Sequence, residues 1–185
     1  MFIPGTLVAL LTFPGVMCHE YAHAIACRRR KIPIYEVCYF QLGTPSGYVR
    51  HREAERHRDA FWITTAPFFI NSLLAIVIVF AWFGISGIVG AGTDSILSII
   101  TVWLAFSIGM HALPSKGDAM NLWRLTKREW KTSVLAIFSI PVVVFLYISH
   151  YLQYLWFDVL FAILLIALGV TAVNFMSTGL ALLPL

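Results

Sequence analysis

The chain has 185 residues, of which 59% are hydrophobic and 12% are charged, and its mean hydropathy is +0.82. Soluble domains have about 25% charged residues, so this composition excludes an ordinary soluble enzyme and favours a membrane protein. The net charge of +4 does not indicate a nucleic-acid-binding protein, because every Lys and Arg lies in one of two blocks, 28–58 and 116–131, between apolar segments.

Apolar length predicts about five transmembrane helices, since about 20 residues are needed to cross the hydrocarbon core of a bilayer. We therefore expect an all-α polytopic membrane protein with a single membrane-embedded domain over residues 1–185. Its core would cover about 1–125, and additional helices about 126–185. The five predicted segments are 2–26, 61–83, 95–113, 133–149 and 154–176.

The basic loops predict how these helices are oriented. Lys and Arg are concentrated between the first and second segments and between the third and fourth, whereas residues 84–93 and 150–153 contain none. Loops rich in Lys and Arg remain cytoplasmic. We expect the N-terminus outside the cell membrane, and the C-terminus and the opening of any active site on the cytoplasmic side.

Two connecting segments have patterns of their own. Residues 32–40 are rich in β-branched and aromatic residues and are followed by a Gly-Thr-Pro-Ser-Gly turn at 43–47, which predicts a small β-hairpin on the cytoplasmic side. Residues 118–131 combine Leu and Trp with basic residues, as interfacial helices do.

The chemistry is concentrated in residues 19–23, which read His-Glu-Tyr-Ala-His, an HExxH pattern. Residues four apart share one face of a helix, so both imidazoles can bind one metal ion, with Glu20 beside it to take a proton from water. Each ionisable residue inside an apolar helix costs about 2.5–3.5 kcal/mol. A position at the helix end, near Arg28, would explain how they are solvated but not why they are His, Glu and His.

A catalytic zinc site has three protein ligands and keeps its fourth position for water. Asp118 is the best candidate for the third ligand, because it follows Pro114 at the cytoplasmic end of the third segment, on the same predicted side as His19 and His23. Asp118 can also cap the helix that follows it, and the two roles are compatible.

Together these features resemble the site-2 protease family of intramembrane zinc metalloproteases, in a divergent form without a PDZ-like domain. The resemblance covers about the first 125 residues: the apolar run into the HExxH helix, the strand at 47–50, the second core helix around 66–75, and the proline-containing loop that ends at Asp118. In that loop the family has Asn where this chain has His111, two prolines where it has one, and Gly where it has Ala119.

The resemblance implies one Zn²⁺ ion per chain, bound by His19, His23 and Asp118, with Glu20 as the general base. The substrate that it implies is a transmembrane protein or peptide, cleaved in or next to its transmembrane segment in the lipid bilayer. The alternative is a non-catalytic metal-binding membrane protein, such as a transporter, a sensor or a pseudoprotease.

Other polar residues have more than one possible role. His111 could donate a hydrogen bond to the oxyanion, replace Asp118 as a ligand, or be a hydrogen-bonded interior histidine. Asn71 could bind the substrate backbone or pair two helices. Asp158 is expected at an interface or between helices, outside the site. Solvated loop or interface positions are expected for His51, His57 and His150.

Overall fold

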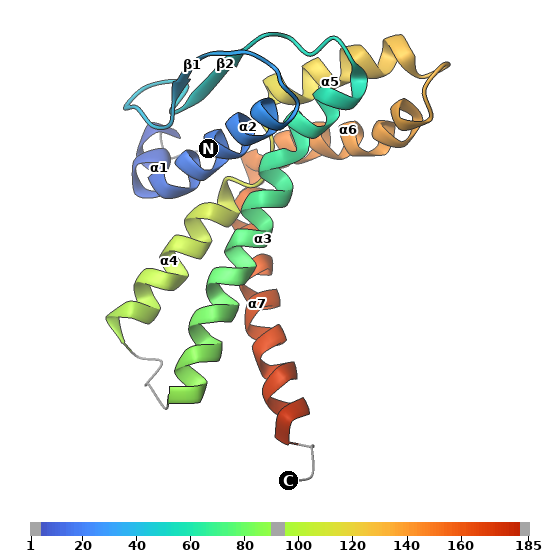
Figure 1. The fold of residues 1–185 in the computed structure, drawn as a ribbon. Helices are drawn as coiled ribbons and strands as arrows, with labels where there is room; N and C mark the ends of the chain where they lie inside the picture. Colours follow the sequence, from blue (N-terminus) through green and yellow to red (C-terminus); the bar gives the residue numbers. More distant parts are fainter. Residues whose placement is uncertain (1–4, 90–94, 182–185) are drawn as a thin grey trace.

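The computed structural model describes residues 5–89 and 95–181. Most of the described chain is helical, with one two-stranded antiparallel sheet (Figure 1). In chain order the elements are α1 Gly5–Leu11, α2 Phe13–Arg29, β1 Ile34–Cys38, β2 Tyr48–His51, α3 His57–Val89, α4 Ile96–Met110, α5 Lys116–Glu129, α6 Val134–Leu152, a 3-10 turn at Gln153–Leu155, and α7 Phe157–Ala181.

Helices α3, α4 and α7 run side by side as a three-helix bundle (Figure 1). Glycines bring these helices close together. A Cβ built on Gly169 of α7 would lie 2.9 Å from Cβ of Val79 in α3, and one built on Gly109 of α4 would lie 3.2 Å from Cα of Ala162 in α7. Small residues at such crossings are typical of helices that pack within membranes.

Three helical segments are long and apolar enough to cross a membrane: His57–Gly87, Val134–Leu155 and Phe157–Thr178. Helix α4 is apolar as well, but it has only 15 residues. The described residues therefore support a helical membrane protein with three candidate spans, and the predicted total of five is not confirmed.

The last two helices follow a different path from the predicted alternation. Helix α6 packs mainly on α5, and the two lie across one end of the bundle (Figure 1). Helix α7 then runs parallel to α3, so the C-terminal ends of these two helices lie at the same end of the bundle (Figure 1). If α3 and α7 cross one membrane, their C-terminal ends lie on one side of it. Alternation over five segments would place those ends on opposite sides.

The first predicted segment is not one helix, because Thr12 separates α1 from α2. Pro14, in the first turn of α2, explains the break. Proline has no N–H to donate, and its ring clashes with the carbonyl four residues earlier, at Leu10. Helix α2, with 17 residues, is the part of the segment that carries the HExxH pattern. Residues 1–4 lie outside the described part of the chain.

The predicted hairpin is confirmed, since β1 and β2 pair antiparallel with Cys38 opposite Tyr48. On the exposed face of the hairpin, Glu36 of β1 links the two strands. It accepts hydrogen bonds from the Tyr48 hydroxyl at 2.7 Å and from Arg50 at 3.0 Å, both in β2. The hydrogen bond from Tyr48, followed by that from Arg50, holds the pKa of Glu36 below its usual range. These cross-strand contacts help to keep the two strands in register.

Helix α5 covers the predicted interfacial segment but begins at Lys116. Ser115 and Asp118 form a capping box at its start, in which each side chain accepts a hydrogen bond from the backbone N–H of the other. The inner face of the helix, with Leu122 and Leu125, packs into the hydrophobic core formed with α2 and α3. The apolar face of α5 is therefore buried in the protein.

Candidate metal centre

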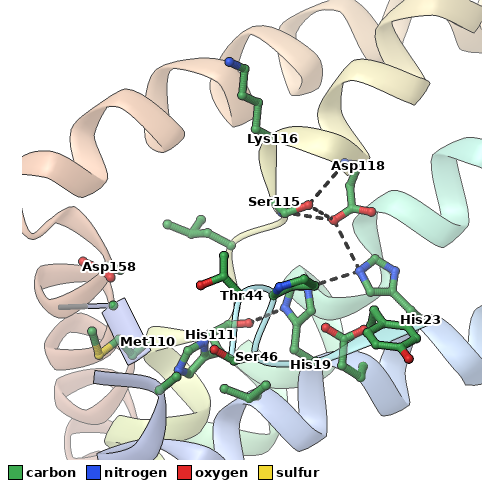
Figure 2. A pocket seen from close by; sticks show the side chains of 18 of the residues that line it. His19, His23, Thr44, Ser46, Met110, His111, Ser115, Lys116, Asp118 and Asp158 are labelled. Atoms are coloured by element: carbon green, nitrogen blue, oxygen red, sulfur yellow. Dashed lines mark hydrogen bonds and ion pairs between the residues drawn. The ribbon is translucent and has the colours of Figure 1, made fainter. Parts of the chain in front are cut away.

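His19 and His23 lie one helical turn apart on the same face of α2 (Figure 2). Their Nε2 atoms are 3.1 Å apart, and the rings meet edge to face with centroids 4.8 Å apart. His23 is buried and His19 is partly buried. The HExxH spacing thus brings two imidazole nitrogens to one point, as the sequence predicts.

Backbone carbonyls fix the orientation of both imidazole rings. Nδ1 of His19 donates to the carbonyl of His111 at 2.7 Å, and Nδ1 of His23 donates to that of Ile63 at 3.0 Å. A carbonyl can only accept, so Nδ1 carries a proton in both rings, and a neutral ring presents a lone pair at Nε2. Two lone pairs 3.1 Å apart repel each other unless one ring is protonated or both bind a cation. Metal-binding histidines are held by the same kind of hydrogen bond.

Asp118 brings a carboxylate to this point from the first turn of α5. Its Oδ2 lies 3.4 Å from Nε2 of His23 and accepts hydrogen bonds from the backbone N–H of Ser115 at 3.1 Å and the Ser115 hydroxyl at 2.6 Å. Burial acts to raise the pKa of Asp118, but His23, His19 and the Ser115 hydroxyl outweigh burial and hold that pKa well below its usual range. The carboxyl group is therefore ionised at neutral pH, as a metal ligand must be.

The spacing of these atoms fits a tetrahedral zinc ion. Ligand atoms about 2.0–2.1 Å from an ion, at tetrahedral angles, lie about 3.3–3.4 Å from one another. The separations are 3.1 Å between the two Nε2 atoms and 3.4 Å between His23 and Asp118. One ligand atom from each of His19, His23 and Asp118 lies within 4.8 Å of the others, and no second group of this kind occurs among the described residues.

Glu20 lies beside this group and is not part of it. Its side chain lines the same cavity and has no hydrogen-bond or ion-pair partner within residues 5–89 and 95–181. The turn before β2 passes closely over it: a Cβ built on Gly47 would lie 2.8 Å from Cγ of Glu20 and 3.1 Å from Cγ1 of Val16. Glycine at position 47 therefore lets the turn cover Glu20 while its carboxylate stays free to hold a proton or a water molecule.

A cavity of about 870 Å³ contains the three candidate ligands and Glu20. This volume falls within the range of about 300–1,000 Å³ that is common for ligand pockets. Its wall is formed by α1, α2, the 44–47 turn, β2, the α4–α5 connection, the end of α6 and the start of α7 (Figure 2). The hairpin that the sequence predicts is thus part of the site.

Of the roles left open for them, His111 has the contacts of a hydrogen-bonded interior histidine, and Asn71 has those of an amide that pairs two helices. The Thr12 hydroxyl donates to the carbonyl of Val8 at 2.7 Å, so it accepts from Nε2 of His111 at 2.8 Å. A neutral His111 ring then has no second N–H to offer to an oxyanion. Asn71 is fully buried and does not line the cavity. Its Nδ2 donates at 3.1 Å to the carbonyl of His111, the oxygen that also accepts from His19.

Several residues lie elsewhere than the sequence predicts. His57 is 1% exposed rather than solvated, and its Nε2 contacts the hydroxyls of Thr126 at 3.0 Å and Ser139 at 2.9 Å, which ties α3 to α5 and α6. The α6–α7 turn returns to the site, a tertiary contact that no local pattern shows. Asp158, which is expected outside the site, lines the cavity, as do His51 and His150, for which the sequence predicts solvated loop or interface positions.

Comparisons of the chain with models of protein families, with curated proteins and with solved structures found no match. The candidate centre therefore depends on the chemistry and geometry of its own residues.

Proposed function

We propose that this chain is a membrane-embedded zinc metalloprotease that hydrolyses peptide bonds in or next to transmembrane segments, as its resemblance to the site-2 protease family implies. The observation that carries the proposal is the group formed by His19, His23 and Asp118, in which backbone hydrogen bonds turn both imidazoles toward one point. The three helices long and apolar enough to cross a membrane support its setting.

The residues of the site divide the chemistry between them. His19, His23 and Asp118 would hold the zinc ion, which when bound supplies a Lewis acid that polarises the peptide carbonyl and lowers the pKa of water. Glu20 would take a proton from the attacking water and pass it to the leaving amine. Its position next to the candidate ligands, without a competing partner among the described residues, suits this role.

The hairpin offers a way to bind the substrate. A transmembrane helix pairs its own backbone N–H and C=O groups, so a segment of it must unwind before the peptide bond can be attacked. Strand β2 lines the cavity, and in the described two-stranded sheet one of its edges is unpaired. An unwound segment can pair with that edge as an added strand. The basic loops favour a cytoplasmic position for the hairpin and for the opening of the site.

The second candidate is a non-catalytic metal-binding membrane protein: a transporter, a sensor or a pseudoprotease. A transport pathway would need ionisable residues at several depths of the membrane, whereas the described residues contain one group able to hold a metal ion. Glu20 favours the metalloprotease, because metal binding alone gives no role to this partly buried acid, which is not among the candidate ligands.

The deciding experiment compares Glu20→Gln with His23→Ala in purified, membrane-reconstituted protein. Zinc is measured by elemental analysis, and cleavage is measured on a panel of fluorescent transmembrane peptides. We expect Glu20→Gln to retain zinc and to lose activity by about 10²–10⁴-fold, because its carboxylate acts on water and is not a ligand. His23→Ala should lose both zinc and activity. Equal zinc loss in the two variants would contradict the assignment of Glu20, and wild-type protein that binds zinc but cleaves nothing would favour the second candidate.

A further inference from the structure

The cavity contains a carboxylate that the proposed chemistry does not use. Asp158, the second residue of α7, lines the cavity and is only 9% exposed. The backbone N–H of Val159 donates to its Oδ1 at 3.0 Å, and no Lys, Arg or His within residues 5–89 and 95–181 forms an ion pair with it. Figure 2 shows Asp158 on the opposite side of the site from Asp118 and His23.

A buried carboxylate without a cationic partner is costly, because it gives up its hydration and gains no ion pair. The start of α7, a helix of 25 residues, favours negative charge at this position. That contribution supports ionisation of Asp158 but leaves Oδ2 without a hydrogen-bond donor among the described residues. This oxygen is therefore open to a cationic group that enters the cavity.

The other charged groups of the cavity do not supply this cation. Lys116 is the only Lys or Arg among the residues that line it, and Figure 2 shows its side chain extending away from Asp158. Glu20 and Asp118 are also acidic, and both are needed at the metal centre. Asp158 lies outside that centre, because it is not in the group of candidate ligands. Asp158 therefore places on one wall of the cavity a carboxyl group that forms no ion pair with the described residues.

We propose that Asp158 recognises a basic side chain of the substrate, the ammonium of Lys or the guanidinium of Arg, close to the bond that is cleaved. This inference rests on the proposed function and names its substrate class: transmembrane segments flanked by a basic residue. Lys and Arg are concentrated beside the cytoplasmic ends of transmembrane helices, so such substrates carry the positive charge that can pair with Asp158. A free N-terminal amine has the same charge, and the experiment separates the two sources.

The test measures binding, so that it does not depend on cleavage. The full chain with Glu20→Gln is placed in nanodiscs with zinc, and binding is followed by the fluorescence anisotropy of labelled peptides. Each peptide has an apolar stretch of about 20 residues and a blocked N-terminus, and is flanked by Lys, by norleucine or by Glu. A fourth peptide has the norleucine flank and a free N-terminal amine, with the label at its other end. The variants are Asp158→Asn and a matched control, Glu53→Gln, which removes the same charge from an exposed acid that does not line the cavity.

We expect the Lys peptide to bind at least about tenfold more tightly than the norleucine peptide, and the Glu peptide to bind most weakly. Asp158→Asn should abolish the difference between Lys and norleucine, and Glu53→Gln should preserve it. Equal binding of the two peptides to protein with Asp158 intact would overturn the proposal without any further variant, as would a preference that survives Asp158→Asn. A free amine that binds as tightly as Lys would overturn the assignment to a side chain. If wild-type protein cleaves all the peptides equally, this inference alone is contradicted. If binding depends on the charge of the peptide but no peptide is cleaved, the proposed function is contradicted.

Discussion

Asn71 and His19 donate hydrogen bonds to the same atom, the backbone carbonyl oxygen of His111, at 3.1 Å and 2.7 Å. Asn71 belongs to α3 and His19 to α2, so this oxygen joins two helices at a candidate ligand. Asn71 is buried and does not line the cavity. It is therefore a positioning residue for the metal centre, and it acts through the carbonyl that orients the His19 ring.

Asn71→Leu should lower zinc affinity by about 10–100-fold, the usual effect of losing a partner that orients a metal ligand. Leucine has a similar size but cannot donate to the His111 carbonyl, so the His19 ring loses part of its support. Competition with a chromophoric chelator measures the affinity. The matched control is Ser72→Ala, because the buried Ser72 hydroxyl has no hydrogen-bond partner in the described structure. Unchanged zinc affinity with weakened peptide binding would instead assign Asn71 to the substrate.

His111→Ala should retain zinc, whereas Asp118→Ala should lose it. The contact of His111 with His19 is made by its backbone carbonyl, which alanine keeps. The His111 ring is held by Thr12 and lies outside the group of candidate ligands. Zinc content after gel filtration of the two variants decides the matter. Zinc loss in His111→Ala with full occupancy in Asp118→Ala would make His111 the third ligand.

Gly47→Ala should slow peptide cleavage by about 10–100-fold while zinc remains bound. The new Cβ would meet Cγ of Glu20 at 2.8 Å and would displace this side chain, and a misplacement of about 1 Å at a reacting centre can cost about 10²-fold in rate. Gly43→Ala, in the same turn region, is the control, because its Cβ would meet only the Gln41 side chain, at 3.9 Å. If both variants cleave at the wild-type rate, the turn does not constrain Glu20.

Zinc should stabilise the folded protein. At a free concentration about 100 times the dissociation constant, a ligand that binds only the folded state adds about 2.7 kcal/mol to the free energy of unfolding. The repulsion between the Nε2 lone pairs of His19 and His23, 3.1 Å apart, is relieved at the same time. Thermal unfolding in detergent, with and without a chelator, measures the shift. His23→Ala should show no shift, and an equal shift in that variant would mean that zinc binds elsewhere.

Single cysteines at Ser95 and Ser177 should react with an impermeant reagent from the same side of the membrane, and a cysteine at Ser46 from the other side. The parallel course of α3 and α7 requires this result if both helices cross the bilayer (Figure 1). The background would lack Cys18, Cys27 and Cys38, which are free cysteines. If Ser177 labels together with Ser46, the helices alternate as the apolar segments alone predict.

The parts of the fold that sequence predicts are those set by local chemistry. Apolar length indicates the helix that begins at Ile96, and Ser95 marks its start by capping it. The 3.6-residue period of a helix is enough to bring His19 and His23 together. Pro14 signals the break at Thr12, but the length of the surrounding apolar run obscures that signal.

The remaining features depend on contacts between distant segments. The sequence shows Asn71 as a polar residue within an apolar helix, and only the approach of α4 reveals which carbonyl it binds. Asp158 is 40 residues from Asp118 in the chain, and the turn between α6 and α7 brings it to the cavity wall. Hydropathy describes each helix separately, so it cannot predict that α6 lies beside α5 across the end of the bundle.

A single oxygen atom, Oδ2 of Asp118, accepts two hydrogen bonds from Ser115 and also faces His23. The first turn of α5 is therefore coupled to the candidate metal centre, since a ligand that draws that oxygen toward the histidines also acts on the helix cap. Further along the same helix, Arg124 binds Glu53 and Arg128 binds the carbonyl of Glu55, both in the loop before α3. If an ion binds at the candidate centre, its occupancy should therefore change amide hydrogen exchange at the start of α5.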